Sequence, residues 1–229
     1  MMSPKEVAGR ALAVAWKDLT AEWRTRATFN AVVALAVVML LLFGFALGPE
    51  TEALQRAAAG IIWLTILFSG VLSFNRSYQI ELDNGALETL LLYPGSRKAI
   101  FLGKFLANLV FVLLVEALLV PLAAILYDLP LVRALPGLIL VSVLGTFGFV
   151  VLGTLYAAMA SRVRAREVLL PLLLFPMLVP VLVAAVAATA AVLVGDPMGD
   201  AGSWIRLLVV FDLIFGIASF FAFEYVIEE

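Results

Sequence analysis

The sequence predicts an all-α membrane protein with six transmembrane helices. Its 229 residues are 64% hydrophobic and only 14% charged, whereas charged residues make up about 25% of an ordinary soluble domain. The apolar residues also gather in six nearly uncharged stretches, and a helix needs about 20 apolar residues to cross the hydrocarbon core of a bilayer. We therefore expect a single membrane domain over residues 1–229, whose spans are residues 27–47, 57–74, 105–127, 135–161, 168–195 and 204–223.

Residues 1–26 precede the first span and carry charges of both signs, so they do not resemble a cleavable signal peptide. Apolar side chains recur there every three or four residues, among them Leu12, Trp16 and Trp23, which places them along one side of a helix. This pattern predicts an amphipathic helix that lies in the headgroup region of the membrane. The alternative is a helix that faces water and packs on the rest of the protein.

Lysine and arginine are unevenly distributed among the segments between the spans. If the N-terminus is cytoplasmic, twelve of the fifteen cations fall in cytoplasmic segments, and only Arg56, Arg133 and Arg206 remain outside. Positively charged segments resist translocation, so this bias sets the orientation. We expect both termini in the cytoplasm, and short outer connections in which prolines such as Pro136 break the helices.

The connection between the second and third spans is long, from residue 76 to 98, and connections of that length usually carry function. Apolar positions in residues 82–93 follow helical spacing, and Pro94 ends the predicted helix. Gly85 costs about 1 kcal/mol relative to alanine inside a helix, so it marks either a surface for close approach or a turn. In the second case Asn84 and Gly85 form the turn, and the helix begins after them.

A short helix held between two spans can receive mechanical work from a separate ATPase, which would move it and the spans as rigid bodies. The phosphate-binding sequence G-x-x-x-x-G-K-[ST] does not occur in the chain. We therefore expect ATP on a partner protein and no enzyme activity in this chain. The expected ATPase-coupling residues are Glu81, Gly85, Leu87, Glu88, Leu90, Leu91 and Pro94.

Two spans contain acidic residues. Glu116 is the twelfth residue of a 23-residue span, so we expect it near the bilayer midplane and facing the interior, as a relay or as a polar link between two helices. Asp212 follows Arg206 by six residues near the outer end of its span. We expect it to be half-solvated and structural.

The fourth and fifth spans contain small and helix-bending residues. Gly145, Gly148 and Gly153 in the fourth span let neighbouring helices approach closely. Prolines bend membrane helices and can form hinges, although they are also common there without a mechanical role. The hinge candidates in the fifth span are Pro171, Pro176 and Pro180.

The chain has no cysteine and no histidine. Disulfides and thiolate metal sites are therefore excluded, and so are the commonest general base and the commonest haem ligand. These absences disfavour an intramembrane enzyme, and we expect no metal site. The net charge of −2 without a basic stripe also excludes nucleic acid as an expected partner.

Motifs between about residues 17 and 183 carry a resemblance to a known family. They are Lys17-Asp18-Leu19 with Glu22, Gly60-Ile-Ile-Trp63, Asn75-Arg76, the run Glu81-x3-Gly85-x-Leu87-Glu88-x-Leu90-Leu91-x2-Pro94, and Pro176-x3-Pro180. Together they resemble the heme exporter protein B family, the permease component of the cytochrome c maturation ABC transporter, within the ABC-2 transporter superfamily. Tyr78 stands where this family more often has phenylalanine.

The resemblance implies a permease of the bacterial inner membrane. Its implied partners are three other proteins of the cytochrome c maturation complex, namely an ABC ATPase, a haem-handling membrane protein and a small accessory protein. Together they deliver haem to apocytochromes c outside the cytoplasm. The resemblance leaves open whether the permease moves haem as cargo or converts ATP hydrolysis into release of a haem-loaded chaperone. Without histidine, a haem contact would need Met, Tyr, carboxylate or apolar packing, which favours the transducing role.

Two other transport functions remain as alternatives. The glutamate–glycine motif is shared by ABC-2 exporters in general, so the cargo could instead be a lipid, a glycan or a drug. A proton-coupled secondary transporter that uses Glu116 and Asp212 is less favoured, because the midplane acid has no basic residue near it in the sequence.

Overall fold

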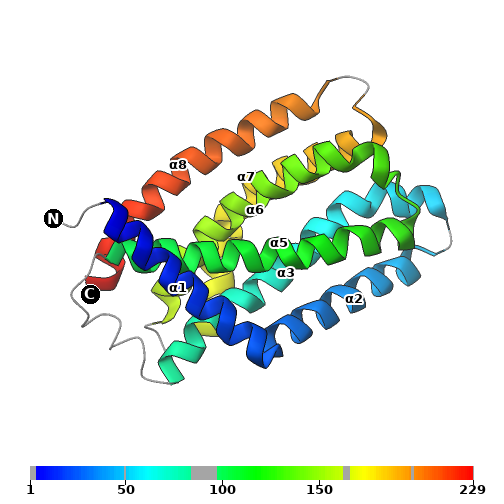
Figure 1. The fold of residues 1–229 in the computed structure, drawn as a ribbon. Helices are drawn as coiled ribbons and strands as arrows, with labels where there is room; N and C mark the ends of the chain where they lie inside the picture. Colours follow the sequence, from blue (N-terminus) through cyan, green and yellow to red (C-terminus); the bar gives the residue numbers. More distant parts are fainter. Residues whose placement is uncertain (1–3, 49, 84–96, 162–165, 197–198, 229) are drawn as a thin grey trace.

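The structure of the chain is a bundle of long helices (Figure 1). The computed structural model describes residues 4–48, 50–83, 97–161, 166–196 and 199–228. Within these ranges the chain forms seven α-helices and no β-strand. They are α1 (Pro4–Thr25), α2 (Ala27–Leu47), α3 (Thr51–Asp83), α5 (Arg97–Tyr127), α6 (Leu131–Ser161), α7 (Arg166–Val194) and α8 (Ala201–Glu228).

Six of these helices, α2 through α8, are long and apolar enough to cross a membrane. The predicted class, an all-α chain with six candidate spans, is therefore confirmed for the residues that the structure describes. The helices extend beyond the uncharged stretches. Helix α3 begins at Thr51 and continues to Asp83, because polar residues outside a hydrocarbon core form backbone hydrogen bonds as readily as apolar ones.

The expectation that Pro136 breaks a helix is wrong. Pro136 lies inside α6, which begins at Leu131. The chain instead turns at Asp128, whose φ of 52° lies in the left-handed region, and Pro130 directly precedes the helix. Proline is tolerated inside membrane helices because neighbouring groups satisfy the backbone carbonyl that it leaves free.

Helix α6 occupies the centre of the bundle and contacts α3, α5, α7 and α8. In the most apolar window of each helix, 72% of α3 and 67% of α6 is buried inside the chain, whereas only 17% of α2 and 22% of α8 is buried. Helices α3 and α6 therefore form the core of the bundle, and α2 and α8 present most of their surface outward.

The contact between α3 and α6 is built from two reciprocal aromatic–glycine pairs. The ring of Phe149 on α6 lies over Gly70 of α3, and the ring of Phe74 on α3 lies over Gly153 of α6. The two rings also contact each other, with centroids 5.0 Å apart. A side chain at either glycine would collide with the opposing ring, so these positions require glycine for close packing, as predicted for Gly153.

Polar groups inside the bundle add specific links between helices. The indole N–H of Trp63 on α3 donates to the hydroxyl of Thr189 on α7 at 2.9 Å, and its ring covers Gly145 of α6. The hydroxyl of Tyr127 on α5 donates to the carbonyl of Leu40 on α2 at 2.7 Å. Each link satisfies a buried polar group that would otherwise be costly in an apolar interior.

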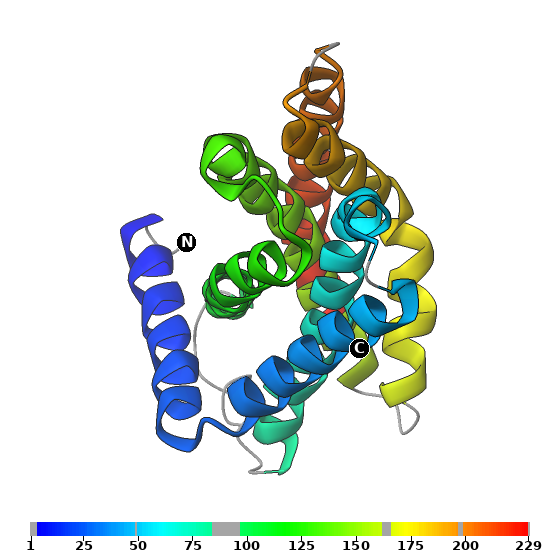
Figure 2. The ribbon, with the colours of Figure 1, turned by 90° about the vertical axis from the view of Figure 1, so that its right-hand side faces the viewer.

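Helix α1 lies across one end of the bundle, which we call the α1 end (Figure 1, Figure 2). The last part of α3 and the end of α8 lie at the same end (Figure 1). Helix α1 packs on α5 through a face that includes Ala11 and Ala15. Its other face exposes Leu12, Trp16 and Trp23, with the two indole side chains 74% and 72% exposed.

Candidate functional site

Most of the predicted ATPase-coupling residues lie outside the part of the chain that the structure describes. The backbone of Glu81 belongs to the end of α3, but its side chain is not among those described. The alternative in which Asn84 and Gly85 form a turn also lies outside the described residues, in the interval 84–96. The other expected coupling residues in that interval are Leu87, Glu88, Leu90, Leu91 and Pro94. The structure does describe the helices that flank segment 84–96, α3 and α5.

A buried lysine joins three helices at the α1 end. Lys104 of α5 is only 1% exposed, and its ammonium group lies 2.9 Å from Oδ2 of Asp18 on α1. The same group donates to the backbone carbonyl of Ser77 on α3 at 3.1 Å. We call Asp18, Ser77 and Lys104 the α1–α3–α5 junction. A buried charge is tolerated when it is paired and hydrogen-bonded, and this one is both.

Close packing surrounds this junction. A Cβ atom on Gly103 of α5 would lie 2.6 Å from Cβ of Val14 and 2.7 Å from the carbonyl oxygen of Ala11, both on α1. Glycine at this position therefore lets the two helix backbones approach and brings the next residue, Lys104, within reach of Asp18. Helix α1 is docked on α5 by backbone proximity as well as by charge.

Helix α1 is also joined tightly to α2. Arg26 between them has a φ of 52°, in the left-handed region, and its N–H donates to the carbonyl of Glu22 at 2.7 Å. A side-chain oxygen of Glu22 accepts a hydrogen bond from the N–H of Phe29 at 2.8 Å. This carboxylate satisfies one of the free N–H groups in the first turn of α2 and complements the helix dipole.

The first turn of α5, which follows segment 84–96, is attached to a different helix. Nζ of Lys98 lies 3.1 Å from Oε2 of Glu224 near the end of α8. It also lies 5.4 Å and 5.1 Å from the ring centroids of Phe220 and Phe221. The start of α5 is thus attached to α8 through Lys98, and to α1 and the end of α3 through Lys104.

Glu116 faces the interior of the bundle, as predicted, and is 3% exposed. Its carboxyl group accepts a hydrogen bond from the hydroxyl of Thr146 on α6. Two turns toward the α1 end, the side-chain N–H of Asn108 on α5 donates to the hydroxyl of Thr154 on α6 at 3.1 Å. These two links connect α5 and α6 in matching register.

Asp212 is 8% exposed, so the expectation of a half-solvated aspartate near the end of its span is wrong. Helix α8 begins at Ala201, which places Asp212 in the middle of the span instead of at its outer end. Its carboxyl group packs against Gly148 of α6, where a Cβ atom would lie 2.5 Å from Oδ1. Neither carboxyl oxygen has a hydrogen-bond partner within the described part of the chain.

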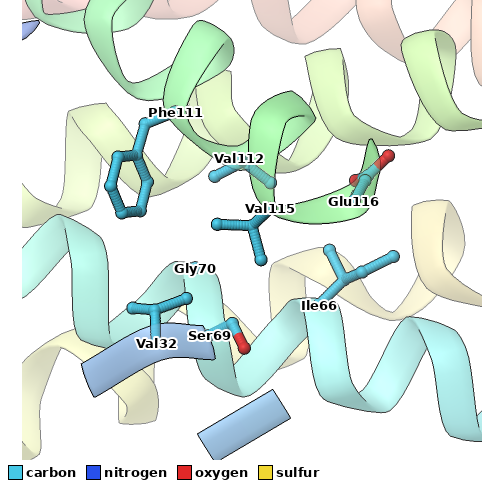
Figure 3. A pocket seen from close by; sticks show the side chains of 8 residues that line it. All are labelled: Val32, Ile66, Ser69, Gly70, Phe111, Val112, Val115 and Glu116. Atoms are coloured by element: carbon cyan, nitrogen blue, oxygen red, sulfur yellow. The ribbon is translucent and has the colours of Figure 1, made fainter. Parts of the chain in front are cut away.

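A narrow crevice lies beside Glu116, between α2, α3 and α5 (Figure 3). Its unfilled space is about 190 Å³, less than the ~300–1,000 Å³ of pockets that hold drug-sized ligands. A porphyrin does not fit into it. No cluster of three or more carboxylates that could hold a metal ion occurs among the described residues. The crevice is lined by Val32, Ile66, Ser69, Gly70, Phe111, Val112, Val115 and Glu116.

The three hinge candidates lie inside one continuous helix, α7. Pro176 and Pro180 point away from the buried stripe of α7, which contains Leu174 and Leu178, and Pro171 is half-buried. The structure therefore leaves the hinge role as a prediction, with two of the three prolines on the exposed side of the helix.

The sequence analysis missed the partners at the α1 end. Asp18 and Glu22 belong to the motifs that carry the family resemblance, but those motifs predict no contact for them or for Lys104. The signal in the sequence was a charged residue directly at the start of an apolar span, because Lys104 precedes the predicted third span by one position. Its partners could not be identified from spacing, since both lie on other helices.

Comparisons with known proteins agree on one family. The family model described as CcmB protein matches residues 9–229 of the chain. A curated relative from Pseudomonas aeruginosa, heme exporter protein B, is 33% identical over 184 residues, which is 80% of this chain and 82% of the relative. Proteins of the same name from Rhodobacter capsulatus and Paracoccus denitrificans are 34% and 32% identical over 161 residues, 70% of this chain and 73% of each relative.

Proposed function

This chain belongs to the CcmB protein family, and from that membership we propose that it is the membrane permease of an ABC complex that exports haem for cytochrome c biogenesis. The observation that carries the proposal is the family match over residues 9–229 together with six helices that can span a membrane. The chain acts as a transport component and not as an enzyme.

ATP hydrolysis occurs on a separate partner protein in this proposal. The sequence contains no phosphate-binding loop of its own. Segment 84–96 and the end of α3 form the surface that binds the ATPase. Its contacts with the ATPase include Glu81, Leu87, Glu88 and Leu91. The attachment of the flanking helices to α1 and α8 supports this assignment, because displacement of the segment can then reach two other helices.

Helix α1 lies in the headgroup region of the inner membrane, with both chain termini in the cytoplasm. The support is the exposure of Trp16 and Trp23 on the face of α1 that turns away from α5, since tryptophan favours the membrane interface. The concentration of lysine and arginine in residues 1–26, 76–104 and 162–166 supports the same orientation.

Haem is the cargo of the complex, and two routes to its export are consistent with the chain. In one, this permease forms part of the path that haem takes. In the other, it transmits the work of ATP hydrolysis to a haem-handling partner, which releases a haem-loaded chaperone. The absence of histidine and cysteine and the small size of the crevice beside Glu116 favour the second route.

A pull-down in mild detergent tests the proposal. Glu88→Lys and Leu91→Asp should each reduce the recovered ATPase at least tenfold, while membrane insertion stays intact. The first reverses a charge in the proposed interface with the ATPase, and the second introduces a carboxylate into that interface. Glu52→Lys is the matched control, since Glu52 carries the same charge at the opposite end of α3. Full recovery of the ATPase with both variants contradicts the coupling assignment.

The identity of the other recovered proteins tests the cargo. Recovery of a haem-handling protein with the wild-type chain supports haem export. Recovery of an ATPase without any such protein points instead to an ABC-2 exporter of a different substrate. Repeating the pull-down with a non-hydrolysable nucleotide shows whether the association depends on the state of the ATPase.

A further inference from the structure

We propose that Lys104 of α5 is a positioning residue that links α1 to the end of α3, so that α1, the start of α5 and the end of α3 move as one body. The proposal rests on the proposed function only in treating segment 84–96 as the place where the ATPase acts. The observation behind it is one ammonium group that contacts two other helices at once, Asp18 of α1 and Ser77 of α3.

Burial makes this contact obligatory for the fold around it. Lys104 is 1% exposed, and a buried ammonium group without partners is strongly unfavourable. Each of the two contacts satisfies part of its hydrogen-bonding capacity, since an ammonium group has three donors. Moving either α1 or the end of α3 away from Lys104 would therefore remove a partner from a charge that water does not reach.

The contact on α3 reaches close to the segment on which the ATPase would act. Ser77 lies six residues before the end of α3 at Asp83. Helix α3 is continuous from Thr51 to that point, and a continuous helix transmits displacement along its axis without an intervening hinge. A force applied beyond Asp83 thus arrives at Ser77 and, through Lys104, at α1.

The contact on α1 leads onward to the first span. Helix α1 packs closely on Gly103 of α5, so α1 is fixed to the bundle along this face. The side chain of Glu22 caps the N-terminus of α2 through Phe29. A displacement that reaches Asp18 is therefore passed to α2, the most outward-facing of the six spans.

The start of α5 provides a contrast within the same region. Lys98 also pairs with a carboxylate, Glu224, but that residue belongs to α8. The start of α5 is thus attached to α8 through Lys98 and, about one and a half turns later, to α1 and α3 through Lys104. Lys104 governs the attachment on the α3 side, and removing Lys98 should leave that side unchanged.

The test measures the separation of α1 and α3 in the assembled complex. The chain has no cysteine, so Ala21→Cys and Arg76→Cys, both at exposed positions, provide two unique sites for spin labels on α1 and α3. Double electron–electron resonance should give a narrow distribution of the distance between the two spin labels in the labelled parent. Lys104→Met should at least double the width of this distance distribution. Lys104→Arg, which retains the charge, should leave the distribution narrow, and so should Lys98→Met.

Activity and assembly are measured on the same variants. Lys104→Met should lower ATP-dependent cytochrome c assembly at least tenfold, with recovery of the ATPase within twofold of the parent, and Lys104→Arg should restore at least half of the assembly. If Lys104→Met does not fold, Asp18→Asn should produce the same broadening, because it removes the carboxylate and keeps the lysine. A distribution as narrow as that of the parent in the folded variant overturns the proposal.

The two proposals fail in different ways. If the wild-type chain recovers no ATPase, the proposed function fails while the distance measurement still decides the role of Lys104 in the fold. If the ATPase is recovered and Lys104→Met leaves both the distance and the assembly of cytochrome c unchanged, the positioning role fails and the proposed function stands.

Discussion

Two buried acids lie on opposite sides of the same helix, α6, in different surroundings. Glu116 on α5 meets the hydroxyl of Thr146, whereas Asp212 on α8 meets Gly148 and no hydrogen-bond partner within the described residues. Thr146 and Gly148 are two positions apart, about 200° around a helix. The comparison shows that one acid is linked to α6 by a hydrogen bond, whereas the described residues supply no donor for the carboxyl group of the other.

The largest effect is expected from Glu116→Lys. A lysine at the centre of a membrane helix costs about 2.5–3.5 kcal/mol, and the hydroxyl of Thr146 would meet an ammonium group in place of an acceptor. The free energy of unfolding, measured by SDS titration of the purified chain, should fall by about 3 kcal/mol. Glu116→Gln is the matched control, because its amide oxygen still accepts the hydrogen bond.

Glu116→Gln should stay within about 0.5 kcal/mol of the wild-type stability, since the amide oxygen still accepts the hydrogen bond from Thr146. Equal losses from the lysine and glutamine variants would contradict the role of Thr146 as the partner. If the glutamine variant assembles normally but loses ATP-coupled activity, Glu116 acts through its charge and not only as a link between helices.

An intermediate effect is expected from Gly148→Ala on the other side of α6. The added methyl group would lie 2.5 Å from Asp212, and 3.1 Å from atoms of both Phe211 and Val181. Overpacking of this kind typically costs about 1–3 kcal/mol, which the same unfolding titration would detect. Gly60→Ala on α3 is the control, because nothing beyond the adjacent part of its own helix lies within 4 Å of the added methyl group. Alanine also has the higher helix propensity, so this control should lose no stability, and similar losses at both sites would contradict the role of the contact with Asp212.

The smallest effect is expected from Asp212→Asn in the isolated chain. No internal hydrogen bond is lost among the described residues, so the free energy of unfolding should change by less than about 0.5 kcal/mol. The same variant should be compared in the assembled complex, where a larger loss of stability would show that a partner protein supplies a donor to Asp212. A loss above about 1 kcal/mol in the isolated chain would show that Asp212 has an internal partner.

The spans could be predicted from the sequence because membrane insertion depends on local composition. Stretches with one charge or none, such as 105–127 and 135–161, coincide with the apolar parts of α5 and α6. Their ends could not be predicted as well, since polar residues such as Thr51 and Asp83 continue a helix at no electrostatic cost once it leaves the hydrocarbon. This is also why the depth of Asp212 was misjudged.

Contacts between helices were less accessible to sequence reasoning. The glycines of α6 correctly indicated close packing, but the pattern did not reveal that Gly153 receives the ring of Phe74 or that Gly148 receives Asp212. The pairing of Lys104 with Asp18 joins residues on two helices whose relative rotation depends on the whole bundle. Local periodicity identifies the face of a helix but not its neighbour.

The reciprocal rings of Phe149 and Phe74 restrict how this bundle can change shape. Each ring fits against a backbone that lacks a side chain, and a shift of α3 along α6 by one or two residues would drive both rings into neighbouring Cβ atoms. Sliding between these two helices is therefore blocked for small displacements. A displacement of α3 therefore carries α6 with it, so the two helices act as one rigid pair against which the outer helices, α2 and α8, can change their positions.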